Sequence, residues 1–288
     1  MNMVPAEGGY SGETHISDAF GERVAVRIYG PRPAARGPAA VEVDAAVLHL
    51  MRGIVPVPPV LEVRRPDPAA DVPALLVTGF VDGVRGDLVL PELDDAGAAR
   101  VGRNLGRVLD RLANLPTLWA GSFTAPSLTV EPFPLELTDL PSYVECRRDD
   151  LVSWSADELT GLDDVAATSQ DLLDEAGRTC FVHSDFNPKN LLVDPDSLEV
   201  TAVLDWEFAH SGHPATDTGN LLRFERRPAF MEAVLESSGT DLSAARAADL
   251  WALVDLAARD HDDQHRNPVT TQAHELLRRI VATGDLHA

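Results

Sequence analysis

The sequence has few cysteines, few basic residues and no long apolar run, and each shortage excludes a class of protein. Cys146 and Cys180 are the only cysteines in 288 residues, too few for the disulfide framework of a small secreted domain. No apolar run approaches the roughly 20 residues that cross a bilayer. The chain does not open with a basic segment followed by an apolar one. We therefore expect a cytoplasmic protein with no membrane partner and a buried free thiol at Cys180.

The deficit of basic residues leaves a strongly acidic chain. Asp and Glu number 46 against 24 Lys and Arg, which gives a formal net charge of -22. A surface of this sign repels nucleic-acid phosphates, so we expect no nucleic-acid partner, and it attracts cations. A cationic small-molecule substrate is one explanation, and plain solubility is the other.

One stretch, residues 180–207, contains the side chains best suited to chemistry. Its apolar runs at 180–182, 191–193 and 200–204 predict short strands joined by turns, with Asp185, Asn190 and Asp205 at their ends. Asp and Asn are common turn residues, but this spacing also suits a base for a hydroxyl group beside a magnesium site. Magnesium takes oxygen ligands, and substrate phosphates and water complete its shell. The stretch therefore predicts phosphoryl transfer from ATP or GTP.

The order His183-x-Asp185-x-x-x-x-Asn190, followed by Asp205, resembles the aminoglycoside phosphotransferase and choline-kinase-like branch of the protein-kinase-like superfamily. The resemblance implies that Asp185 is the catalytic base and that Asn190 and Asp205 hold Mg²⁺. We expect His183 to brace the loop rather than to react.

A second motif, Gly-x-Pro-x-x-Asp at residues 212–217, is also typical of that family. We expect its Asp217 to cap the helix that follows. The family resemblance implies an α+β fold of the bilobal protein-kinase-like type. It divides the chain into a β-rich N-lobe at 1–79 with a glycine-rich loop and one helix, a hinge at 80–83, and a helical C-lobe at 84–288.

The N-lobe should bind the nucleotide. Its glycine turn can offer backbone amides to phosphate oxygens, at Gly8, Gly9, Ser11 and Gly12. Alternation over residues 14–28 then predicts a hairpin. The strand 24–29 carries Arg27 where the kinase template has lysine, and its planar guanidinium would hold the phosphates differently. An exposed strand arginine is the alternative.

The pattern of residues 39–52 predicts a helix that supplies a carboxylate to pair with Arg27. Glu42 has the longer reach, but Asp44 stands where the family usually has glutamate, and we favour Asp44. An apolar strand at 74–83 follows. The resemblance implies that it leads into the hinge and binds the nucleotide base through Thr78, Gly79, Phe80 and Val81. We expect the Phe80 ring to pack in the core.

The remainder of the chain is predicted to be mainly helical. An amphipathic helix runs from about 94 to 114 with its arginines on a solvated face, two helices cover 140–178, and further helices cover 230–281. Residues 116–139 lack periodicity and are predicted to be an irregular insertion. The candidates for binding substrate amines are Glu207, Asp260, Asp262 and Asp263, although solvated helix ends would look the same.

Together these features predict a magnesium-dependent O-phosphotransferase that acts on a hydroxyl of a small, cationic molecule. The favoured acceptor is an antibiotic, either an aminoglycoside or a basic cyclic peptide such as viomycin or capreomycin, whose modification confers resistance. A kinase for choline, a sugar or another metabolite, a macrolide kinase and a non-catalytic nucleotide-binding pseudokinase remain open. So does a metallohydrolase that uses His183, Asp185 and Asp205 directly.

Overall fold

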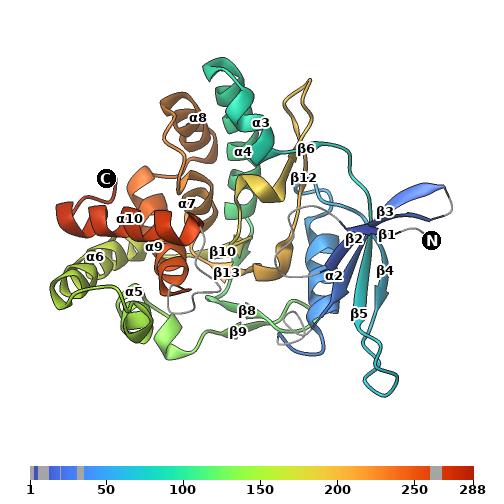
Figure 1. The fold of residues 1–288 in the computed structure, drawn as a ribbon, viewed down its shortest axis with the longest axis horizontal. Coiled ribbons are helices and arrows are strands. Elements are labelled where there is room, and N and C mark those ends of the chain that lie inside the picture. Colours follow the sequence, from blue (N-terminus) through green and yellow to red (C-terminus); the bar gives the residue numbers. More distant parts are fainter. Residues whose placement is uncertain (1–2, 6–12, 20, 31–35, 260–267) are drawn as a thin grey trace.

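The structure is a computed structural model that describes residues 3–5, 13–19, 21–30, 36–259 and 268–288. A sheet covered by one helix forms the N-terminal part, and a mainly helical part follows beside it (Figure 1). Among the described residues, no helix is both long and apolar enough to cross a membrane. Both cysteines are free, and Cys180 is buried as predicted.

The N-terminal sheet is antiparallel with the strand order β1-β2-β3-β5-β4. Alternate residues of β5 are buried because one face of the sheet packs on the core. Strands β2 and β3 form the predicted hairpin, which pairs Thr14 with Arg27. The strands are β1 (Met3–Pro5), β2 (Glu13–Ala19), β3 (Glu22–Tyr29), β4 (Val60–Arg64) and β5 (Ala74–Gly79).

Helix α2 (Ala40–Met51) lies on this sheet and confirms the helix predicted over 39–52. It contacts β4 and β5 on one side and the short 3₁₀ helix η5 (Trp206–Phe208) on another. Val47 and Met51 are almost fully buried, at 1% and 0% exposure. The helix therefore connects the N-terminal sheet to the segment that follows Asp205.

Residues 80–83 lead from β5 to β6 (Val84–Arg85), which belongs to a small sheet of order β12-β11-β6. Its other strands are β11 (Leu191–Val193) and β12 (Val200–Val203). A Cβ at Gly83 would lie 2.6 Å from Thr201 Oγ1, and the φ of Gly83 is +153°, so both space and backbone favour glycine. The assignment of residues 80–83 as a hinge, and of the lobe boundaries around it, stays a prediction.

The helices of the C-terminal part agree with the sequence pattern. In α4 the predicted arginine face is exposed, while Val101, Leu105 and Leu109 are buried. Asp94 caps α4 by accepting from Gly97 N at 2.8 Å. The helices are α3 (Gly86–Val89), α4 (Asp95–Ala113), α5 (Leu140–Arg147), α6 (Ala156–Asp174), α7 (Thr216–Leu222), α8 (Pro228–Ser238), α9 (Leu242–Ala258) and α10 (Pro268–Thr283), with 3₁₀ turns η1 (Leu90–Glu92), η2 (Leu135–Leu137) and η3 (Arg148–Asp150).

The prediction of an irregular insertion at 116–139 is wrong. This segment contributes three strands to a second sheet of order β7-β10-β13-β8-β9, and its Phe123 ring stacks on Phe181 with centroids 4.8 Å apart. The strands are β7 (Pro116–Thr117), β8 (Gly121–Phe123), β9 (Val130–Pro132), β10 (Thr179–Val182) and β13 (His210–Gly212). Two or three residues are too few to show alternation, so the pairing is visible only in three dimensions.

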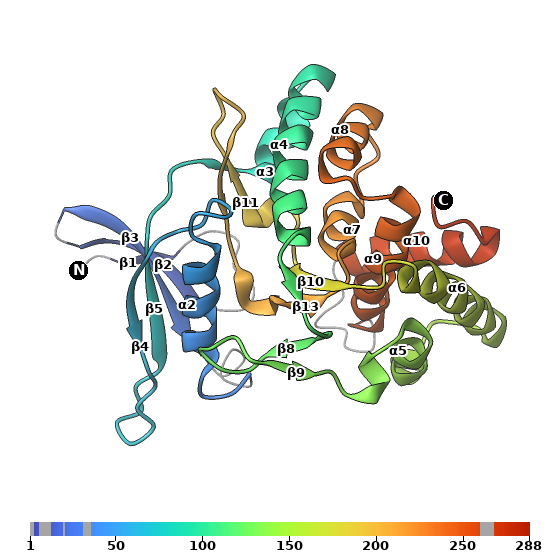
Figure 2. The ribbon, with the colours of Figure 1, turned by 180° about the vertical axis from the view of Figure 1, so that it is seen from behind.

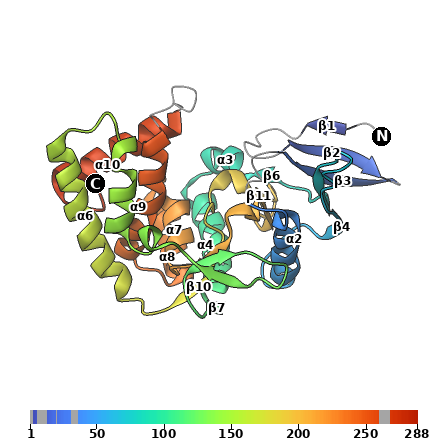
Figure 3. The ribbon, with the colours of Figure 1, turned by 90° about the horizontal axis from the view of Figure 1, so that it is seen from below.

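The described residues form two apolar cores. One runs from α2 and the N-terminal sheet through α4 to β10, β11, η5 and α8. The other lies among α5, α6, α9 and α10, farther from the N-terminal sheet (Figure 3). The β8–β9 hairpin extends from the side of α5 toward α2 (Figure 2). The first core thus lies directly beneath the segments that carry the predicted site.

Candidate active site

The loop of residues 183–190 orients Asp185 through two neighbouring amides. Asn187 Nδ2 donates to Asp185 Oδ1 at 2.7 Å, and Asn190 Nδ2 donates to Oδ2 at 2.8 Å. Asn187 is the residue just before the 3₁₀ helix η4 (Pro188–Asn190), and Asn190 is its last residue. Because each carboxylate oxygen accepts one of these bonds, the rotation of the carboxyl group is fixed.

His183 braces this loop, as the sequence predicted. Its ring is fully buried and lies 4.5 Å, centroid to centroid, from the Trp206 ring. Its Nδ1 accepts from Asp185 N at 3.2 Å, which assigns the proton to Nε2, and Nε2 then donates to Leu204 O at 2.8 Å. One side chain thereby ties the backbone at Asp185 to the backbone next to Asp205.

Asp217 holds the same loop through its carboxylate. The prediction that it caps the following helix is wrong. Its carboxylate accepts from His183 N at 2.8 Å and from Ser184 N at 2.7 Å. Ser184 has a left-handed φ of 70°, a conformation that needs such support in a residue other than glycine. Helix α7 instead begins after Ala215 without a side-chain cap. The 33-residue separation hides this contact from sequence patterns.

Asp205 follows β12 and adopts a left-handed backbone with φ 60° and ψ 64°. Leu204 N donates to Asn190 O at 2.7 Å, which joins this turn to the 183–190 loop. Burial raises the pKa of Asp185. His183 and the two amides lower it, and the negative charge of Asp205 raises it further. The two carboxylates are therefore close enough to interact.

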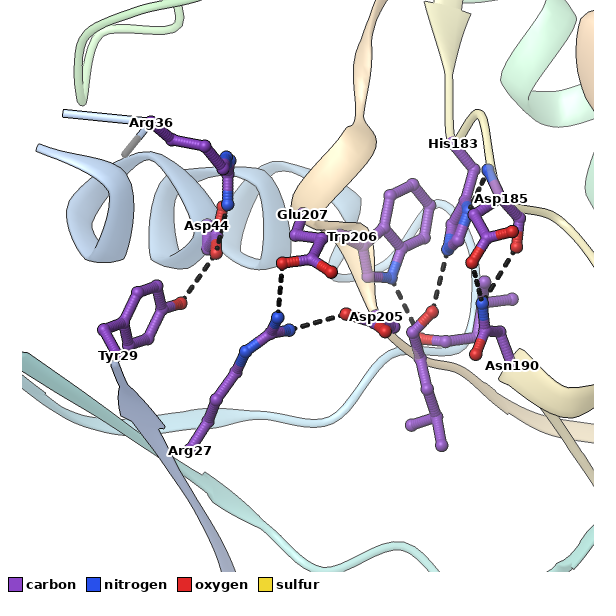
Figure 4. Close-up of polar contacts among 12 residues, drawn as sticks. Arg27, Tyr29, Arg36, Asp44, His183, Asp185, Asn190, Asp205, Trp206 and Glu207 are labelled. Carbon is purple, nitrogen blue, oxygen red and sulfur yellow. Dashed lines mark hydrogen bonds and ion pairs between the residues drawn. The ribbon is translucent and has the colours of Figure 1, made fainter. Parts of the chain in front are cut away.

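Arg27 reaches Asp205 and Glu207 from strand β3. Its Nη1 donates to Asp205 Oδ1 at 2.6 Å and its Nη2 donates to Glu207 Oε2 at 2.6 Å (Figure 4). Burial lowers the pKa of Arg27, but the charges of Asp205 and Glu207 raise it by more, so the guanidinium is firmly protonated. The cation predicted to meet the phosphates thus lies beside the carboxylate predicted to hold magnesium.

The predicted pairing of Arg27 with Asp44 or Glu42 is wrong. Tyr29 Oη donates to Asp44 Oδ2 at 2.6 Å, and Arg36 donates to both oxygens of Asp44. Glu42 binds Arg65 at 2.6 Å on the outer side of α2. An aspartate is one methylene shorter than the glutamate usual in the family. Its carboxylate binds Tyr29, which lies two residues from Arg27 on the same face of the strand.

Glu207 lies in a different place from the one predicted. We expected it to meet the substrate, but its side chain is 3% exposed and binds Arg27. Helix α2 packs against η5, and this contact keeps Glu207 on the side of the N-terminal sheet. No periodic pattern indicates this contact, because Asp205-Trp206-Glu207 has the same composition as an ordinary acidic turn.

The predicted base-binding segment runs through the end of β5. Thr78 is 9% exposed, and Gly79 N donates to Pro59 O at 2.9 Å. Val81 and Phe80 are half-buried. The prediction that Phe80 packs in the core is wrong, because its ring lies 4.0 Å below the Arg23 guanidinium and gains a cation–π contact there. Contact of these residues with a nucleotide base stays a prediction.

Seven predicted site residues lie outside the residues that the structure describes. These are Gly8, Gly9, Ser11 and Gly12 of the glycine turn and the acidic residues Asp260, Asp262 and Asp263.

The oxygen atoms at this site fit magnesium better than zinc. Asn190 donates through Nδ2, which leaves its amide oxygen for a cation, and Arg27 binds one oxygen of Asp205. Across the described ranges, no group of three or more His, Cys, Asp or Glu residues could hold a metal unaided. Magnesium commonly uses one or two protein oxygens with substrate phosphates and water. Asn190 and Asp205 therefore suit a magnesium ion that arrives with a nucleotide.

Comparison with known proteins assigns the fold. The model of the phosphotransferase enzyme family matches residues 3–251. A thermostable mutant of aminoglycoside phosphotransferase APH(4)-Ia superposes with a TM-score of 0.68 at 16% identity, covering 99% of this chain and 95% of that one. Wild-type aminoglycoside 2'-phosphotransferase-IIIa, bound to GDP, gives 0.70 at 16% identity over 99% and 94%. These likenesses confirm the predicted bilobal, kinase-like α+β fold.

Curated relatives match over shorter stretches. Mouse acyl-CoA dehydrogenase family member 11 is 42% identical over 55 residues, which are 19% of this chain and 7% of that protein. The chicken protein of the same name is 30% identical over 101 residues, which are 35% and 11%. This chain therefore spans only a small part of the length of these relatives.

Proposed function

The chain belongs to the phosphotransferase enzyme family, whose members with this fold include small-molecule kinases, and we propose that it transfers the γ-phosphoryl group of ATP or GTP to a hydroxyl group. The observation that carries this proposal is the convergence of three elements on one point. The 183–190 loop brings Asp185, the turn after β12 brings Asp205, and strand β3 brings Arg27.

Asp185 would accept the proton of the attacking hydroxyl. Its carboxylate is fixed by Asn187 and Asn190, so little reorganisation is needed when the hydroxyl arrives. Asn190 and Asp205 would hold Mg²⁺, which on binding neutralises charge that develops on the phosphates. Arg27, beside Asp205, would add a positive charge that stabilises the same phosphates.

The nucleotide side of this proposal has support in the solved neighbours. APH(4)-Ia, at a TM-score of 0.67 and 18% identity over 98% of this chain and 94% of that one, was solved with ADP and hygromycin B. The 2'-phosphotransferase was solved with GDP. We therefore propose a purine nucleoside triphosphate as the phosphoryl donor, bound between the N-terminal sheet and the 183–190 loop.

The acceptor that we propose is a cationic antibiotic, and its modification would confer resistance. Two features favour it. Hygromycin B, which the neighbour binds, is an aminoglycoside, and the net charge of -22 attracts amine-bearing molecules. Basic cyclic peptides share this chemistry. A small metabolite such as choline or a sugar would use the same transfer step.

A nucleotide-consumption screen tests the proposal. Purified protein is incubated with Mg²⁺ and either ATP or GTP, together with aminoglycosides, basic cyclic peptides, choline and sugars, and release of ADP or GDP is followed. We expect acceptor-dependent release with at least one amine-bearing antibiotic. Expression in a susceptible host should raise the inhibitory concentration of that compound.

A matched variant separates transfer from binding. Asp185→Asn should lower kcat by about 10²- to 10⁴-fold, the usual contribution of a general base, while the nucleotide Kd stays within about threefold. Loss of nucleotide binding in this variant would point to a structural role for Asp185. Turnover by the variant at the wild-type rate would exclude the proposed mechanism.

A further inference from the structure

Arg36 lies close to the site but has no part in the mechanism described so far. It precedes α2, and its Nη2 and Nη1 donate to Asp44 Oδ1 and Oδ2 at 2.7 and 3.0 Å. Tyr29 donates its hydroxyl to Asp44 Oδ2 from β3. Asp44 is 4% exposed, so Arg36 is anchored from the interior of the protein (Figure 4). The guanidinium therefore has one fixed orientation.

The outer side of this guanidinium is still able to bind a ligand. Arginine has five N–H donors, and Asp44 takes one each from Nη1 and Nη2. For the remaining three, no acceptor is found among the described residues. The Arg36 side chain is 28% exposed, whereas that of Asp44 is 5% exposed. An anchored arginine with outward donors is a common arrangement for binding phosphate.

Arg36 also belongs to the same charged cluster as Arg27. Figure 4 shows Glu207 between the Arg36–Asp44 pair and Asp205. Burial lowers the pKa of Arg36, but bonding to Asp44 and the charge of Asp44 raise it by more, and Glu207 adds to the increase. Glu207 in turn binds Arg27 at 2.6 Å. The two guanidinium groups thus flank one carboxylate.

The negative charge of the nucleotide phosphates favours a second cation at the site besides Arg27. The sequence contains a single lysine, Lys189, so arginines must supply most of the positive charge that a polyphosphate needs. Arg27 is already matched by two carboxylates, those of Asp205 and Glu207. Within the described part of the chain, Arg36 has one carboxylate partner, Asp44, and that partner also accepts from a neutral hydroxyl.

We propose that Arg36 is a second phosphate-binding residue of the nucleotide site, positioned by Asp44 and Tyr29. The inference rests on the proposed function, because the phosphates are those of the nucleotide co-substrate. It also accounts for the aspartate at position 44. The short carboxylate leaves Arg27 to Asp205 and Glu207 and holds Arg36 instead, so two arginines face the phosphates rather than one.

Calorimetric titration of Arg36→Gln with ATP, ADP and adenosine, or their guanine equivalents, tests this inference. We expect the Kd of the tri- and diphosphate to rise by about 10- to 100-fold, the effect of losing a charge-assisted hydrogen bond, with no change for the nucleoside. Arg65→Gln is the matched control, because Arg65 binds Glu42 on the exposed side of the same helix. It should change none of these values. Arg36→Lys should recover part of the lost affinity.

Each other outcome has a defined meaning. Wild-type nucleotide affinity in Arg36→Gln, with or without a lower melting temperature, would overturn the inference and make Arg36 structural. A parallel loss of nucleoside binding would overturn it too, because the fold of the site would then be at fault. Failure of the wild type to bind any nucleotide would reject the proposed function itself. Asp44→Asn, which frees Arg36, should weaken triphosphate binding less than Arg36→Gln does.

Discussion

At the scale of single residues, the two acids of the site differ in what binds them. Asp185 accepts from two neutral amides, whereas Asp205 binds a charged guanidinium. Amide donors orient a carboxylate without cancelling its charge, so a proton remains a favourable partner for Asp185. A residue that takes a hydroxyl proton needs this property, and a residue that binds a cation does not.

This difference predicts the acid limb of the pH profile. Burial, together with the charge of Asp205, raises the pKa of Asp185 despite the opposing effect of His183 and the amides. The proposed base works only when ionised, so kcat/KM should fall as pH decreases through a midpoint above the ordinary aspartate value of about 4. Measurements of kcat/KM between pH 4 and 8 check this. A midpoint at or below that value, in enzyme shown to remain folded, would contradict it.

Residue spacing predicted this loop well and its partners poorly. Asp185 and Asn190 are five residues apart in one loop, so local backbone geometry brings them together. A contact between Arg27 and Asp44 depends instead on whether the two side chains are long enough to meet between strand β3 and helix α2. One methylene fewer in Asp44, and a hydroxyl on Tyr29, redirected that contact. Sequence spacing does not encode such distances.

At the scale of secondary-structure elements, glycines set how closely α4 packs on α8. The two helices lie side by side in both front and back views (Figures 1 and 2). A Cβ at Gly106 would lie 2.6 Å from Ser237 Cβ and 2.7 Å from Val234 O. The second of these atoms belongs to backbone, which cannot move aside as a flexible side chain can.

Gly106→Ala should therefore destabilise the protein. Alanine gains about 1 kcal/mol of helix propensity over glycine, but overpacking of this kind costs about 1 to 3 kcal/mol and requires the helices to separate. We expect a net decrease in the free energy of unfolding, measured by urea denaturation. Arg103→Ala, on the exposed face of the same helix, should stay within about 0.5 kcal/mol of wild type. A more stable Gly106→Ala protein would contradict this prediction and show that the two helices can move apart at little cost.

Long periodic elements could be predicted, and short paired ones could not. Helix α4 repeats its apolar residues over five turns, so its buried face was evident. Strands β7, β8 and β9 have two or three residues each. Strands β7 and β8 pair with β10 and β13 far along the chain, and β9 pairs with β8. Asp217, which supports the 183–190 loop, was misplaced for the same reason.

At the scale of the whole molecule, the site rests on a core shared by both parts of the chain. The same apolar cluster contains Tyr29 and Met51 from the N-terminal part and Leu105, Phe181 and Trp206 from the C-terminal part. Arg27 lies on β3, the strand that also carries Tyr29, and it meets Asp205, which directly precedes Trp206, at 2.6 Å. Since the core connects the two, a change in its packing should alter how Arg27 meets Asp205.

The net charge of -22 acts over the whole surface and gives a prediction about the acceptor. Salt screens exposed charges over a Debye length of about 10 Å at 0.1 M, so attraction of a cationic acceptor should weaken as salt is added. For an amine-bearing acceptor found in the screen, we expect KM to rise about three- to tenfold between 20 and 300 mM NaCl, in line with electrostatic steering. Initial rates at fixed, saturating nucleotide measure this.

The same acceptor with its amines acetylated is the control, because it keeps the hydroxyl groups and loses the charge. Its KM should be higher at low salt and should change less than about twofold over the same range, since screening has no attraction to remove. Parallel salt dependence of the two forms would mean that the acidic surface does not select the acceptor. In that case the excess of 46 acidic over 24 basic residues would serve solubility, and an uncharged metabolite would be the better acceptor to test.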